Sequence, residues 1–109
     1  MANVSCFKQT QTFTIPPDGT EFFTLGPSDA FSNGAITVTA IPRTGTPGVS
    51  LFIEVVQMAT RHAPKFGPAG GHQDFFLDIV VRNNSHANNP ADSLSTITSF
   101  DVFVSVVTP

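Results

Sequence analysis

The sequence contains no tryptophan, no tyrosine and one cysteine, and charged residues make up only 12% of its 109 residues. Tryptophan and tyrosine are the aromatic residues that most often anchor binding surfaces, because each joins an apolar ring to a polar group. We therefore expect the eleven phenylalanines to serve mainly as core residues. The single Cys6 excludes an intramolecular disulfide framework, and we expect it to be a small buried hydrophobe.

Charge and hydropathy exclude two broad classes of protein. The net charge is −3 and the five Lys and Arg residues are scattered, whereas a nucleic-acid-binding protein presents a basic stripe or patch. The longest apolar runs are far shorter than the ~20 residues that span a bilayer, so we expect no membrane insertion. The first residues resemble no signal peptide, which predicts a cytoplasmic protein or an exported protein expressed without its leader.

Alternation of apolar and polar residues, interrupted by Pro, Gly and Asn, dominates the chain and predicts β-strands. A chain of this length fits a single domain, here residues 1–109. The predicted strands cover residues 7–15, 21–25, 35–41, 49–60, 75–82 and 96–107. Six to seven strands without significant helix predict an all-β fold, a single antiparallel β-sandwich of Ig-like or jelly-roll-like topology. A small barrel is the alternative.

Two of the predicted strands carry apolar residues on both faces. In the segment 49–60, Ile53 and Val55 are predicted on one face, with Val56 and Met58 on the other. In the last strand, alternate residues from Phe100 to Val106 are predicted to face inward. Phe103 and Val107 then face outward and form a modest apolar patch, which another strand or another chain would cover.

The C-terminal third carries a resemblance. Its two strands read Phe-Phe-Leu-Asp-Ile-Val-Val-Arg-Asn-Asn-Ser from Phe75 and Phe-Asp-Val-Phe-Val-Ser-Val-Val from Phe100. This pair resembles the closing strands of bacterial Ig-like sandwich modules. The resemblance implies a sandwich fold and assigns no functional residue.

A long connection over residues 61–74 is the first candidate site, because loops of more than ~12 residues are uncommon and often functional. It combines an apolar residue in mid-loop with basic and imidazole side chains. Alternating strand directions would bring residues 26–34 to the same end of the sandwich. The candidate surface then comprises Arg61, His62, Lys65, Phe66, His72, Asp74, Asp29 and Asn33. The alternative is a mobile connection, or one that folds back and buries Phe66.

Metal binding and catalysis are not expected. His62 and His72 could meet with Asp74 to hold a metal, but their spacing matches no known motif, and we expect solvated histidines and no cofactor. The second long connection, residues 83–93, is predicted to be a polar turn region. Glu54 and Asp78 could form a carboxylate pair, but the solvated face of the sheet is the expected place for both. No catalytic motif is present, so the chain is not expected to be an enzyme.

Two functions are consistent with these sequence features. Low charge, spare strand edges and outward Phe103 and Val107 favour a structural or surface-display subunit that associates with copies of itself. The alternative is a monomeric module that binds a protein or a glycan through the 61–74 loop.

Overall fold

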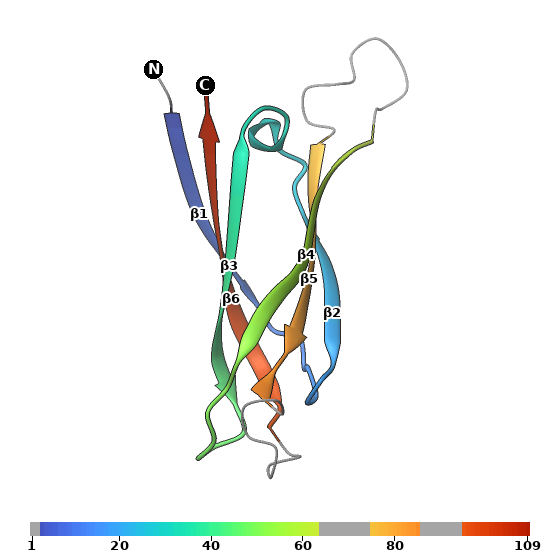
Figure 1. Cartoon of the computed structure of the whole chain (residues 1–109), viewed down its shortest axis with the longest axis vertical. Coiled ribbons are helices and arrows are strands. Elements are labelled where there is room, and N and C mark those ends of the chain that lie inside the picture. The colour runs from blue at the N-terminus through green and yellow to red at the C-terminus, as the bar shows by residue number, and fades with distance from the viewer. Residues whose placement is uncertain (1–2, 64–74, 86–94) are drawn as a thin grey trace.

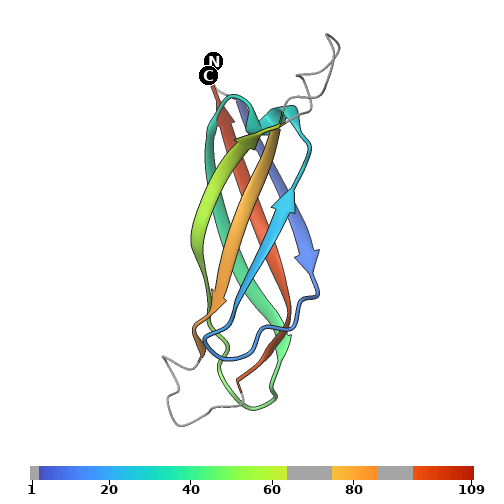
Figure 2. The same cartoon turned by 90° about the vertical axis from the view of Figure 1, so that its right-hand side faces the viewer.

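Two three-stranded antiparallel sheets pack face to face in the computed structural model, which describes residues 3–63, 75–85 and 95–109 (Figures 1 and 2). The prediction of an all-β sandwich is thus confirmed. One sheet, here sheet A, has the order β1-β6-β3, and the other, sheet B, has the order β2-β5-β4. The strands are β1 (Asn3–Gln11), β2 (Thr20–Leu25), β3 (Ala35–Gly45), β4 (Ile53–His62), β5 (Phe75–Asn83) and β6 (Ile97–Thr108). A 3-10 turn, η1 (Asp29–Phe31), lies between β2 and β3.

The first strand begins and ends four residues earlier than predicted. β6 is twelve residues long, and its far end gives Asn3 a partner in Thr108, so pairing continues to the start of the described chain. After Gln11 the chain leaves sheet A, and Ile15 forms an isolated bridge with Ile97. A tight turn through Asp18 follows, closed by the bond from the Gly19 amide to the Pro16 carbonyl at 2.8 Å.

A bulge in β4 overturns the predicted faces of that strand. Val55 lies opposite Val81 and Gln57 lies opposite Val80, so Val56 has no partner across the sheet. One extra residue reverses the alternation beyond it. Met58 consequently lies opposite the buried Ile79, on the inner side of the sheet, instead of beside Val56 on the outer side.

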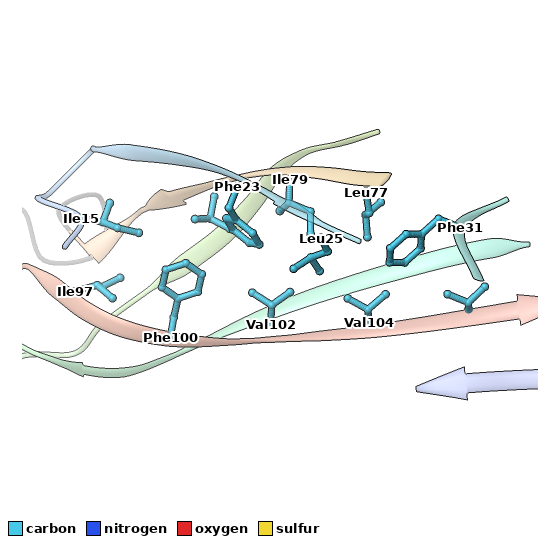
Figure 3. Close-up of a cluster of buried hydrophobic side chains, with 12 residues drawn as sticks. Ile15, Phe23, Leu25, Phe31, Leu77, Ile79, Ile97, Phe100, Val102 and Val104 are labelled. Atoms are coloured by element: carbon cyan, nitrogen blue, oxygen red, sulfur yellow. The ribbon is translucent and has the colours of Figure 1, made fainter. Parts of the chain in front are cut away.

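The core lies between the two sheets and follows the predicted alternation of the central strands (Figure 3). β5 contributes Leu77, Ile79 and Val81, and all three side chains are fully buried. Phenylalanine rings fill the middle: Phe23 and Phe100 lie 5.8 Å apart between ring centroids, in a tilted arrangement. The remaining buried apolar residues are Ile15, Leu25, Phe31, Ile97, Val102, Val104 and Val106.

Two buried polar side chains, Asn83 and Ser85, join four segments at the end of the sandwich opposite the chain termini. The Asn83 side-chain amide donates to the carbonyls of Ile15 at 2.9 Å and Ser95 at 2.8 Å, and its oxygen accepts from the Ser85 amide at 2.9 Å. The Ser85 hydroxyl in turn accepts from the Phe52 amide at 2.9 Å. The start of the predicted polar turn region is therefore part of the core, because these side chains satisfy backbone groups that would otherwise be buried without partners.

Candidate functional site

The segment between β2 and β3 lies at the same end of the sandwich as the end of β4 and the start of β5 (Figure 1). The Ser28 amide donates to the Phe75 carbonyl at 3.0 Å and so joins the two segments. Ser28 also caps η1, since its hydroxyl accepts from the Ala30 amide at 3.1 Å. Phe31 closes this end of the core from the same turn. The segment 26–34 therefore lies beside the start of β5, at the same end of the sandwich as Arg61 and His62.

Arg61 belongs to β4 and is held by sheet B, whereas the sequence suggested a residue of the free loop. Its guanidinium donates to the Asp78 carboxylate, from Nε at 2.8 Å and from Nη2 at 3.3 Å. It also lies 4.6 Å above the centre of the Phe76 ring. The reason for the difference is that β4 and β5 remain paired to His62 and Phe75.

Asp78 is the acceptor at the centre of this arrangement. The Thr24 hydroxyl donates to its Oδ1 at 2.8 Å from the neighbouring strand β2. The hydrogen bonds from Arg61 lower the pKa of the Asp78 carboxyl, and the bond from Thr24 acts in the same direction against partial burial. Asp78 is therefore held in its charged form.

The remaining predicted loop-surface residues fall into two groups. His62 also lies in β4, where its ring stacks on Phe75 with 4.2 Å between centroids. Asp29 begins η1, and both Asp29 and Asn33 are exposed. The other four lie outside the described residues: Lys65, Phe66, His72 and Asp74. In the part of the chain that the structure describes, no three His, Cys, Asp or Glu side chains lie close enough to hold a metal.

Glu54 and Asp78 lie on the outer side of sheet B, but at different positions along it. Glu54 is opposite Arg82 and Asp78 is opposite Ala59, so the two rows lie four positions apart along β5. Asp78 is already bound by Arg61 and Thr24. The two carboxylates do not share a site.

The outer face of sheet A contains the predicted self-association residues. Val107 is 42% exposed and lies opposite Val4, which is 64% exposed, with Ala35 on its other side. Phe103 is half-buried between Lys8 and Thr39. Exposed apolar side chains therefore lie at both ends of this face: Val4 and Val107 near the chain termini, and Ile41, which is 37% exposed, opposite Asp101.

A charged cluster occupies the other end of the same face. Asp101 accepts from the Thr10 hydroxyl at 2.6 Å and from the Arg43 Nε at 2.6 Å. The bond from Thr10, then that from Arg43, lowers the pKa of the Asp101 carboxyl, and the nearby Lys8 charge adds to this. The cluster joins all three strands of sheet A and leaves little of Asp101 exposed.

Cys6 is exposed, and the prediction of a buried cysteine is wrong. It lies on the outer side of β1 opposite Ser105, whose hydroxyl is 3.5 Å from the Cys6 sulfur. The reason is the length of β1, which carries residues 3–10 along an edge where every side chain is exposed. The sequence signal for this edge was the run of consecutive polar residues from Lys8 to Gln11, which places polar side chains on both sides of the strand.

Comparison with protein-family models, with curated proteins and with solved structures finds no match for this chain. Among the described residues, no helix has the length and apolar character needed to cross a membrane.

Proposed function

We propose that this chain is a non-enzymatic β-sandwich subunit that associates with copies of itself through sheet A. The observation that carries the proposal is the exposure of β1, in which every residue except Gln11 is exposed. Exposed residues include the apolar Val4 on the outer side and Phe7, 36% exposed, on the inner side. A long strand edge with apolar side chains is a ready template for pairing with another chain.

The free edge of β1 is a stronger candidate for this contact than the outer face of sheet A. On that face, Phe103 is half-buried, and the Asp101–Arg43 ion pair lies beyond it. Stacking another copy on this face would remove water from the ion pair, which is costly. Pairing along the edge leaves Arg43 in solvent.

Two further properties support self-association. The net charge of −3 generates little repulsion between copies. An antiparallel strand edge is self-complementary, because a two-fold rotation brings it against its own copy in the antiparallel direction. Asp78 and Asp101 each form an ion pair with an arginine, which favours a structural role for these acids over general acid–base chemistry.

The test is the absolute mass in solution, measured by size-exclusion chromatography with light scattering over a wide range of protein concentrations. We expect a mass that rises from 11.6 kDa toward a multiple of this value as concentration increases. A mass of 11.6 kDa at every concentration would contradict the proposal.

A second candidate is a module that binds a protein or a glycan at the end of the sandwich near His62. The observation that favours it is the bond from Ser28 to Phe75, which brings exposed Asp29 and Asn33 to this end. A panel of immobilised glycans and peptides tests this function. Binding that Arg61→Ala abolishes and Arg43→Ala leaves intact would support it, since Arg43 makes a similar ion pair in the other sheet.

A further inference from the structure

The four edge strands of the sandwich differ in how they are protected against pairing with another chain. β3 contains Pro42 and two register shifts, and it lies against β4. β4 contains the bulge at Val56. β2 is only six residues long. Prolines, bulges, shortness and coverage are the devices that keep strand edges from associating.

β1 has none of these devices among the described residues. It is nine residues long, contains no proline, and pairs with β6 without a register shift. It carries a single charge, on Lys8. Its inner side is covered only in part: Phe7 contacts the ring of Phe31, with 5.9 Å between centroids, but stays 36% exposed, and Ser5 and Gln9 beside it are exposed. Among the described strands, the backbone edge of β1 that faces away from β6 therefore has no partner strand.

We propose that β1 pairs antiparallel with β1 of a second copy about a two-fold axis at Phe7, so that the two sheets A form one continuous six-stranded sheet. This inference rests on the self-association proposed above and specifies its contact and register. A second copy fits this edge because Lys8 is the one charged residue of β1. Two copies can therefore pair without placing like charges opposite each other.

The register follows from the length of β1 and the position of Lys8. A continuous sheet requires outward residues to lie opposite outward residues. An axis at Phe7, the midpoint of Asn3–Gln11, pairs all nine residues of each strand. An axis at Lys8 would place two lysines directly opposite each other, which is destabilising. An axis at Cys6 would leave the last two residues of each strand, Thr10 and Gln11, unpaired.

In the Phe7 register, two kinds of cross-strand neighbour result. Phe7 lies opposite Phe7 of the second copy on the inner side, where an aromatic pair is favourable. Lys8 lies opposite Cys6 of the second copy on the outer side, and the two-fold axis makes this contact occur twice. The charge of the side chain at position 6 therefore determines how strongly the two copies associate.

Substitutions at Cys6 test the register, because the sign of their effect differs between registers. In the full chain under reducing conditions, the dissociation constant is measured by sedimentation for Cys6→Glu, Cys6→Lys and the neutral reference Cys6→Gln. Two opposite-charge pairs predict that Cys6→Glu tightens the dimer roughly 2- to 30-fold, and Cys6→Lys weakens it by a similar factor. Val107→Asp, which adds a charge to the outer face away from the edge, is expected to leave the dissociation constant unchanged. Circular dichroism and thermal melting confirm that each variant is folded.

The other outcomes separate this inference from the function on which it rests. If Cys6→Glu and Cys6→Lys both weaken the dimer, the Phe7 register is overturned. If Val107→Asp weakens it as well, the two copies stack through the outer faces of sheet A. A dimer that neither variant affects would mean that β1 is not the contact. A wild-type monomer at every concentration would overturn the proposed self-association and this inference together.

Discussion

Asp78 and Asp101 occupy equivalent positions in the two sheets. Each lies in the central strand, and each accepts a hydrogen bond through Oδ1 from a threonine directly opposite it on one edge strand. Each also accepts through Oδ2 from the Nε of an arginine on the other edge strand. In both sheets this arginine follows two residues after the residue that pairs with the aspartate. Each sheet is therefore fastened across its three strands by the same set of side chains, on its outer face.

The repeated ion pair predicts how stability changes with pH. Both carboxyls have a pKa below the ordinary value of 3.8 in the folded protein, so their stabilisation is present above that value. As the pH falls, the unfolded chain takes up protons first, and the stabilisation is lost as the pH passes through the folded pKa values. We expect the free energy of unfolding of the wild type to decline from about pH 5 downward.

The double variant Asp78→Asn/Asp101→Asn is the control for this pH dependence. At neutral pH it is less stable than the wild type in urea titrations, and the difference between the two proteins narrows as the pH is lowered. Of the single variants, Asp101→Asn has the larger effect, because its side chain is 8% exposed against 19% for Asp78. A difference that stays constant with pH would show that the carboxylates contribute nothing through their charge.

Two adjacent phenylalanines predict a sharp contrast in stability. Phe23 is 6% exposed and packs against Phe100, whereas Phe22 is 59% exposed on the outer side of sheet B. Phe23→Ala is expected to lower the free energy of unfolding by about 3–5 kcal/mol. Phe22→Ala is expected to change it by no more than about 0.5 kcal/mol, as for other surface substitutions. Urea denaturation measures both, and similar losses would contradict the assignment of the two faces.

The buried Asn83 predicts a loss of stability that sequence position alone would not suggest. Asn83→Ala removes three hydrogen bonds and leaves buried backbone groups of Ile15, Ser95 and Ser85 without that partner. At ~1 kcal/mol for each bond, with an added penalty for the unsatisfied groups, we expect a loss of about 3–5 kcal/mol. Asn33→Ala, at an exposed position, is the matched control and is expected to be neutral. A neutral Asn83→Ala would contradict the network.

The exposed thiol of Cys6 is open to chemical modification in the folded protein. We expect a thiol reagent such as Ellman's reagent to modify one sulfhydryl per chain without denaturant, at a rate similar to that in urea. A thiol that reacts only after unfolding would show that Cys6 is covered in solution. The rate is measured at low protein concentration, where self-association has the least effect.

The sequence pattern predicted the strands and most of the core, because the alternation of apolar residues is dictated by burial of one face. It did not predict the bulge at Val56, since the run from Val55 to Met58 is compatible with either face until the pairing with β5 is known. The role of Asn83 was also not predictable. Polar residues after a strand are typical of a solvated turn, and only the arrival of Ile15 and Ser95 from distant parts of the chain makes this one a core residue.

The candidate site was predicted less well than the fold. Arg61 and His62 were recognised as distinctive, but their engagement with Asp78 and Phe75 depends on how far β4 extends. Phe103 and Val107 were correctly assigned to the outward side of their strand. Their exposure differs because Phe103 lies in mid-strand between Lys8 and Thr39, whereas Val107 lies near the end of β6 beside the small Ala35.

The position of β6 in sheet A has a consequence for how the chain is made. Both β1 and β3 pair with β6, which is the last of the six described strands to be synthesised. Sheet B, in contrast, has all of its strands once residue 83 has been synthesised. Until the last strand emerges, the inner faces of β3 and sheet B have no complete partner layer, and pairing across such long sequence separations is slow. A premature stop codon before Ile97 would remove the whole of sheet A from the fold, and not only one strand. Folding of the sandwich is therefore completed only after β6 has been synthesised, and the nascent chain is most prone to aggregate just before that point.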